Sequence, residues 1–82
     1  MLRTHMFQIA TIYVPTKRAK TLDAEKVGRI AESILDVGQT TPILVREDGD
    51  RYILVEGLHR LEALKSLGEA TVEAHIVQAR KH

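Results

Sequence analysis

The segment Val55-Glu56-Gly57-Leu58-His59-Arg60 places a carboxylate, a glycine, an imidazole and a guanidinium where a short apolar strand should pass into a helix. The first N–H groups of a helix lack intrahelical partners and carry the positive end of its dipole, so they attract anions. Cations there are unfavourable by about 0.3–1 kcal/mol each at exposed sites. A His-Arg pair at this position therefore favours a bound anion, with phosphate as the natural candidate.

The predicted phosphate site has a backbone part and a side-chain part. Gly57 lets the backbone approach a ligand closely, the N–H groups from Gly57 and Leu58 onward point at it, and His59 and Arg60 add donors. The residues alone leave an alternative open: Gly57 eases a tight turn, and Arg60 pairs with Glu56 or Glu62.

Glu56 directly precedes this phosphate site, and a carboxylate repels a phosphate unless a proton or a divalent cation lies between them. Glu56 is thus a candidate Mg²⁺ ligand or general base, and hence a candidate catalytic residue. A loop carboxylate that bonds its own backbone, or that Arg60 neutralises, is the alternative.

Lys26 and Ser33 are seven residues apart and fall on nearly the same face of a predicted helix, where they form a polar strip. From the residues alone this strip is weak evidence for a ligand. No histidine pair has a metal-ligand spacing, so no metal site is expected from protein side chains alone.

The elements that position these residues follow from hydrophobic periodicity. An apolar spacing of i, i+3, i+4 and i+7 predicts a helix within Leu22–Val37, with Thr21 or Asp23 as N-cap and Gly38 after its end. The other predicted elements are a strand Phe7–Val14, a hairpin Ile43–Val55 with a turn at Glu47–Asp50, a helix ending at Gly68, and a strand Thr71–Val77. Met1–Met6 should be a loose start and Ala79–His82 a basic tail. The order β-α-β-β-α-β predicts a small α/β (α+β) domain whose mixed sheet is covered by two helices.

The composition fits one domain over residues 1–82, with its core at about 7–78. Twelve Lys and Arg against eleven Asp and Glu give a net charge of +1, which argues against a free-standing DNA binder. The chain has no Cys, which excludes disulfides and thiol chemistry. It has neither a membrane-length apolar run nor a signal segment, so we expect no membrane contact and a cytoplasmic location.

The ordered set of motifs resembles the ParB/sulfiredoxin superfamily over roughly residues 9–78. The resemblance rests on Val14-Pro15, Leu22–Val27, Gly38-Gln39, Pro42-Ile43 and Glu56–Ala63, with Gly-x-His-Arg the most specific part. Sulfiredoxins use Gly-Cys-His-Arg, bind ATP-Mg²⁺ and reduce a sulfinic acid through the cysteine. Leu58 stands in that place here, so the resemblance excludes sulfiredoxin activity.

The same resemblance implies that His59, Arg60, Lys26 and Ser33 match positions that hold a nucleotide. ParB proteins bind and hydrolyse CTP and continue into a helix-turn-helix domain, which this chain would end too early to contain. Free serine kinases carry an acidic residue directly before Gly-x-His-Arg, the place of Glu56, which implies phosphoryl transfer.

Together these observations predict a ParB-like domain that binds ATP, ADP or CTP with Mg²⁺, as a weak NTPase or phosphotransferase. Whether the chain is an enzyme stays open. The alternatives are a non-catalytic DNA-associated accessory module related to plasmid and chromosome partition proteins, and a scaffold that dimerises or binds a protein partner. Nucleic-acid binding should be weak or indirect.

Overall fold

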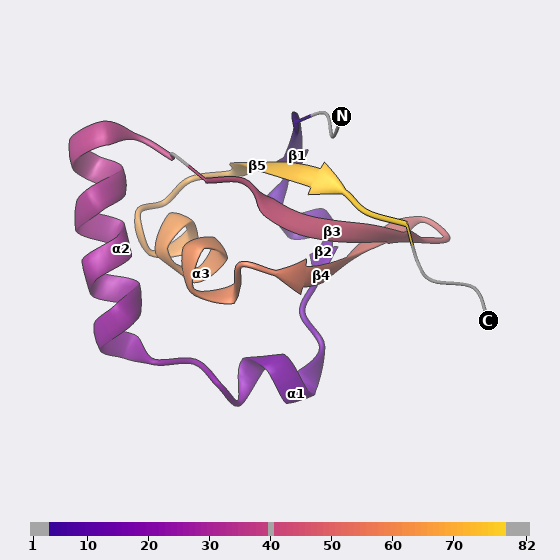
Figure 1. Ribbon diagram of the computed structural model, residues 1–82, viewed down its shortest axis with the longest axis horizontal. Coiled ribbons are helices and arrows are strands. Elements are labelled where there is room, and N and C mark those ends of the chain that lie inside the picture. The colour runs from indigo at the N-terminus through magenta and orange to yellow at the C-terminus, as the bar shows by residue number, and fades with distance from the viewer. Residues whose placement is uncertain (1–3, 40, 79–82) are drawn as a thin grey trace.

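The computed structural model describes residues 4–39 and 41–78, and it confirms a small mixed α/β fold (Figure 1). Five strands form one sheet in the order β1-β5-β3-β4-β2. The elements along the chain are β1 (Thr4–Gln8), a 3-10 turn η1 (Ile9–Thr11), β2 (Ile12–Tyr13), α1 (Thr16–Ala19), α2 (Ala24–Val37), β3 (Ile43–Asp48), β4 (Arg51–Glu56), α3 (Leu58–Ser66) and β5 (Thr71–Ile76).

The sheet is strongly curled, because β1 and β2 are its two edges and yet only the three residues of η1 separate them. Three residues span at most about 10 Å, so the two edges must lie close together. The rings of Phe7 in β1 and Tyr52 in β4 confirm this, since their centroids are 4.6 Å apart. The curl lets a short chain enclose its core.

The predicted strand Phe7–Val14 is wrong as a single element. It is broken by η1, where the N–H of Ile9 donates to the carbonyl of Ala70 at 2.8 Å and Ile9 is buried. The β-branched residues favour extended backbone on both sides, but the closure of the sheet imposes a turn between them. Thr4–Met6 belongs to β1 and pairs with β5. The prediction of a loose start over Met1–Met6 was therefore wrong for these three residues. Residues 1–3 and 79–82 lie outside the described residues, including the predicted basic tail.

Helix α2 matches the predicted helix, and Asp23 rather than Thr21 is its N-cap. It ends at Gly38, as predicted, where a φ of 80° with a ψ of −177° is a backbone conformation that favours glycine. None of its residues is buried, and it packs chiefly against α3 rather than directly on the sheet (Figure 1). Just beyond it, the Gln39 side chain accepts from the N–H of Glu73 and donates to its carbonyl, at 2.9 and 3.0 Å, which ties this end of α2 to β5.

The core lies between α3 and the sheet. Leu61 and Leu64 of α3 are buried, and so is Leu58 at the start of the helix. The other large core residues come from the strands and from η1: Ile9, Ile12, Ile43, Val45, Leu54 and Val72. In β5, Val72 and Ala74 are buried, whereas Glu73 and His75 are half-buried.

The hairpin is longer than predicted, with β3 and β4 extending over part of the expected turn and leaving Gly49 and Asp50 between them. The one-turn helix α1 was not predicted.

Within the described residues, no helix has the length and apolar character needed to cross a membrane.

Candidate nucleotide-phosphate site

Helix α3 begins at Gly57, which is its N-cap and has φ 108° and ψ 29°. A Cβ added here would lie 2.6 Å from Cγ2 of Ile43, so both the backbone conformation and the packing require glycine. The first hydrogen bond of the helix runs from the N–H of Leu61 to the carbonyl of Gly57 at 2.9 Å. Helix geometry therefore leaves the N–H groups of residues 58–60 without intrahelical acceptors, and glycine has no side chain to cap them.

A cleft of about 250 Å³ opens at this helix start. We call it the cationic cleft, because three of its lining residues are Arg18, Lys26 and Arg60. It is lined by residues of α1, α2, α3, the end of β4 and the loops beside them: Arg18, Thr21, Lys26, Ile30, Glu56, Gly57, Leu58, His59 and Arg60. The structure thus brings together the predicted Gly57–Arg60 set, Glu56 and Lys26.

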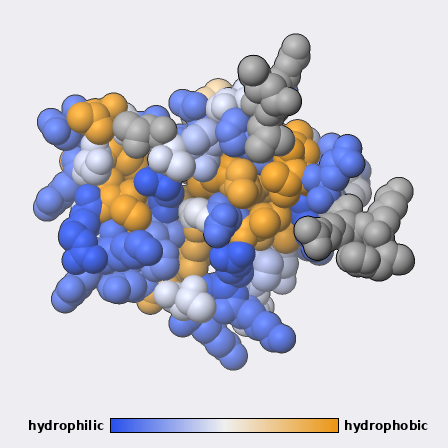
Figure 2. Space-filling model, viewed as in Figure 1, coloured by the Kyte–Doolittle hydropathy of each residue, from blue (hydrophilic) through white to orange (hydrophobic). Residues whose placement is uncertain are grey.

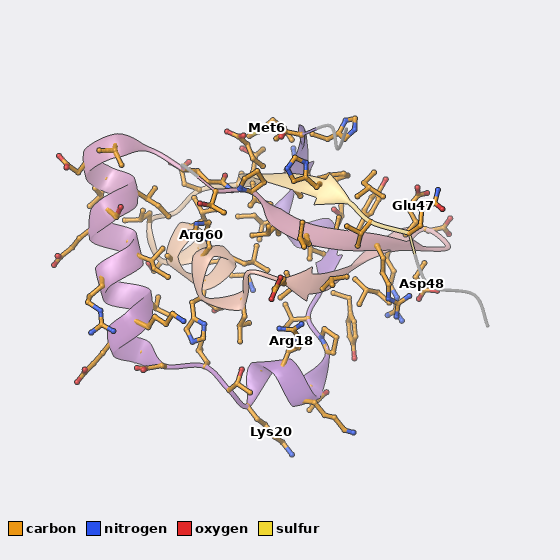
Figure 3. All side chains as sticks on the ribbon, in the orientation of Figure 1. Met6, Arg18, Lys20, Glu47, Asp48 and Arg60 are labelled. Atoms are coloured by element: carbon orange, nitrogen blue, oxygen red, sulfur yellow. The ribbon has the colours of Figure 1, made fainter. Side chains whose placement is uncertain are left out.

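Arg18 lies in this cleft and was missed by the sequence reasoning. It extends from α1 to the end of β4, where its Nη2 donates to the carbonyl of Val55 (Figure 3). The turn that follows Arg18 is held by Thr21, whose hydroxyl donates to the carbonyl of Arg18 at 2.7 Å. The only signal in the sequence was an unassigned basic run, Lys17–Lys20, following a proline. Figure 2 shows hydrophilic side chains along this lower rim of the molecule.

His59 connects the two long helices. Its Nε2 accepts a hydrogen bond of 3.0 Å from the backbone N–H of Asp23. Asp23 is also the N-cap of α2, and its carboxylate accepts from the N–H groups of Glu25 and Lys26. Two helix N-termini therefore meet at the cationic cleft.

The remaining predicted site residues lie in different surroundings. Leu58 has its side chain in the core, so it can serve a ligand only through its backbone N–H. Lys26 is exposed and lines the cleft. Ser33 is exposed on α2, two turns beyond Lys26, and is not among the residues that line the cationic cleft.

Glu56 is exposed at the end of β4 and borders two clefts. The second, of about 430 Å³, shares Gly57 and Arg60 with the first and is otherwise lined by Thr41, Pro42, Leu44 and His75. Among the described residues, no ion pair within 4.0 Å includes Glu56 or Arg60, and Glu62 pairs with Lys65 at 3.1 Å instead. The geometry therefore does not support the alternative in which Arg60 is neutralised by a neighbouring carboxylate.

The lining of the cationic cleft suits an anionic group better than a bare metal ion. Within residues 4–39 and 41–78, no three His, Asp or Glu side chains gather where they would hold a metal. Mg²⁺ is commonly held by one or two carboxylates together with substrate phosphates, and Glu56 supplies one carboxylate beside a cationic cleft.

Sequence comparison finds relatives of two kinds. The chain is 36% identical over 62 residues to a probable chromosome-partitioning protein ParB of Campylobacter jejuni, which covers 76% of this chain and 22% of that protein. It is 34% identical over 67 residues to the chloroplastic/mitochondrial sulfiredoxin of Arabidopsis thaliana, covering 82% of this chain and 54% of that one. The chain thus spans about a fifth of the ParB relative and about half of the sulfiredoxin.

Solved structures with the same fold include members of the same two groups and of a third. Arabidopsis thaliana sulfiredoxin superposes with a TM-score of 0.85 at 30% identity, covering 94% of this chain and 86% of that one. A truncated ParB from Caulobacter crescentus complexed with CTP-gamma-S gives 0.81 at 24% identity, covering 96% and 46%. A free serine kinase mutant in complex with ADP gives 0.78 at 21% identity, covering 90% and 30%. At these last two identities the likeness shows the fold alone.

The family model of the ParB N-terminal domain matches residues 3–82, nearly the whole chain. With relatives and structural neighbours among both the partition proteins and the sulfiredoxins, the resemblance seen in the motifs is confirmed. The chain belongs to the ParB N-terminal domain family, within the ParB/sulfiredoxin superfamily.

Proposed function

We propose that this domain binds a nucleoside tri- or diphosphate with its phosphates in the cationic cleft, at the start of α3. The observation that carries the proposal is the coincidence of an uncapped helix N-terminus with Arg18, Lys26 and Arg60 in one cleft. Each feature alone attracts anions weakly, but three cations from three separate helices converge here without carboxylate partners within 4.0 Å among the described residues. Two structural neighbours are described as complexes with CTP-gamma-S and with ADP, which supports this class of ligand.

Glu56 is the proposed catalytic residue, because it borders both the cationic cleft and the second cleft. Phosphates bound in the first cleft would lie beside an acceptor, water or a hydroxyl, in the second. In the proposed transfer, the acceptor oxygen bonds to the terminal phosphorus while the bond from that phosphorus to the leaving phosphate oxygen breaks. The acceptor's proton passes to the Glu56 carboxylate. The chain would then act as a weak NTPase or a phosphotransferase.

Nucleotide binding is tested by thermal unfolding with ATP, ADP, CTP and GTP, each with and without Mg²⁺. A ligand at 100 times its Kd should stabilise the fold by about 2.7 kcal/mol. Arg60→Ala should abolish this stabilisation while the free protein stays folded. Arg51→Ala is the matched control, because it removes the same charge from the hairpin, where Arg51 pairs with Asp48 at 3.3 Å. Equal responses of both variants would overturn the assignment of the site.

Catalysis is tested separately with Glu56→Gln, which keeps the size of the side chain and removes its charge. We expect nucleotide binding to persist or tighten and turnover to fall by about 100-fold or more. A wild-type chain that binds nucleotide but neither hydrolyses nor transfers phosphate would be a binding module.

A partition-associated accessory role is the second proposal, favoured by the family and by the ParB relative. With a net charge of +1, direct DNA binding should be weak. Each phosphate contact contributes about 0.9 to the slope of log K against log salt, so two or three contacts provide little affinity at physiological salt. Sub-micromolar duplex binding at about 150 mM salt would place this role first.

A further inference from the structure

We infer that His59 is a positioning residue: as a neutral imidazole protonated on Nδ1, it holds the start of α2 and Lys26 at the cationic cleft. This inference deepens the proposed function and rests on it for the identity of the ligand. It differs from the expectation drawn from the sequence, in which His59 served as one more donor to the phosphates. The contact that carries it joins two helices rather than a helix and a ligand.

The hydrogen bond to Asp23 fixes the state of the imidazole. A backbone N–H can only donate, so the Nε2 atom 3.0 Å from the nitrogen of Asp23 must present its lone pair. The ring proton of the neutral side chain is then on Nδ1, and an imidazolium could not accept this bond. The positive charge of the cleft therefore comes from Arg18, Lys26 and Arg60.

Apart from its packing on α3, the start of α2 has few hydrogen bonds to the rest of the fold. No residue of α2 is buried, and the carboxylate of Asp23 is already engaged by the N–H groups of Glu25 and Lys26. Within the described residues, the bond to His59 is the only hydrogen bond that joins α2 or its cap to α3. The other end of α2 is held independently, through Gln39 and Glu73.

Loss of the His59 bond should consequently loosen one end of α2 and leave the other in place. Lys26 lies three residues after Asp23, in the first turn of the helix, so its ammonium depends on where this end sits. His59 would thus act on the ligand through Lys26. That dependence separates a positioning residue from a residue that only contributes its own hydrogen bond.

Two variants remove the imidazole ring, and only one of them keeps an acceptor atom at about the position of Nε2. In His59→Gln, the side-chain oxygen can reach about the position of Nε2 and accept from Asp23. In His59→Asn, the oxygen is one bond shorter and cannot. Amide hydrogen exchange of the ligand-free chain should show the Asp23 amide protected in the wild type and in His59→Gln. In His59→Asn it should exchange about tenfold faster, with Glu73 unchanged.

The tautomer and the coupling to Lys26 are measured next. The ¹⁵N shifts of His59 should report a neutral ring protonated on Nδ1. Lys26→Met should weaken binding of inorganic triphosphate in the wild type and in His59→Gln, and have a smaller effect in His59→Asn. Thermal unfolding of each free variant identifies any that fail to fold. If His59→Asn fails to fold, the positioning role of His59 is decided by His59→Gln and the ¹⁵N shifts alone.

The outcomes for the inference and for the proposed function are distinct. If the wild type binds neither triphosphate nor nucleotide, the proposed function fails, yet the Asp23 amide still reports whether His59 holds α2. Equal Asp23 exchange in the Gln and Asn variants, a ring protonated on Nε2, or an unchanged Lys26 effect in His59→Asn would overturn the positioning role.

Discussion

The two long helices begin within hydrogen-bonding distance of one another, but their N-termini are built in opposite ways. Helix α2 has Asp23 as its cap, and the carboxylate accepts from the N–H groups of Glu25 and Lys26 at 3.0 and 3.4 Å. Helix α3 has Gly57, with no side chain to offer. The N-terminus of α2 is therefore satisfied internally, with a negative charge in place, whereas that of α3 is left open to an external acceptor.

Under the proposed function, the capped end of α2 serves the fold, and the open end of α3 serves a ligand. A side-chain cap at position 57 is excluded by the fold itself, since Ile43 occupies the space where a Cβ would lie. The same glycine thus satisfies a packing demand and leaves the first N–H groups of α3 without a side-chain cap, where the proposed anion would bind. The self-capped α2 contributes to the cleft through Lys26, and the open α3 contributes through its backbone.

The largest expected loss of stability comes from adding a side chain at Gly57, the N-cap of α3. Gly57→Ala should destabilise the fold by about 2–4 kcal/mol, because it combines a left-handed backbone with a collision against Ile43. Gly68→Ala is the control: its φ is 77° but no atom lies within 4 Å of the added Cβ, so it should cost only about 1–2 kcal/mol. Urea denaturation measures both, and equal losses would show that contact with Ile43 is unimportant.

A second prediction asks whether the two helix ends differ toward an anion. Inorganic triphosphate at 100 times its Kd should slow amide exchange at His59 and Arg60 by up to about 100-fold, because opening of these groups requires release of the ligand. The amides of Glu25 and Lys26, already bonded to Asp23, should respond much less. An equal response at both ends would contradict the view that only α3 is open.

The sequence predicted most of the fold and many of the residues that line the candidate site, and the misses have a common cause. Local signals were enough for α2, the hairpin, α3 and β5, since each has a clear period and a cap or glycine at its end. The η1 break and the helix α1 depend on the closure of the sheet, which no local pattern reports. Arg18 was missed for the same reason, because its partner is the carbonyl of Val55, 37 residues away. The use of His59 as an acceptor also required the packing of α2 on α3 to be known.

Removing the side-chain cap of α2 should destabilise the fold less than Gly57→Ala does. Asp23→Ala removes the cap of α2 and should cost about 1 kcal/mol, within the usual range of about 0.5–2 kcal/mol. Asp23→Asn keeps an accepting oxygen, so it should recover most of that stability while losing the negative charge. Thermal unfolding of the three proteins in parallel is sufficient, and a full loss in the Asn variant would mean that charge rather than capping stabilises this end.

The smallest expected effect tests whether α2 is limited by its own propensity rather than by its neighbours. Gly28 lies inside α2, and no atom is within 4 Å of a Cβ added there. Because glycine in a helix interior costs about 0.5–1 kcal/mol relative to alanine, Gly28→Ala should stabilise the free protein by that amount. The melting temperature should rise by about 2–8 °C, given about 4–8 °C per kcal/mol for a domain of this size. Since the added methyl touches nothing, triphosphate affinity should stay the same; a weaker affinity would mean that the start of α2 needs the freedom of Gly28 to close on its ligand.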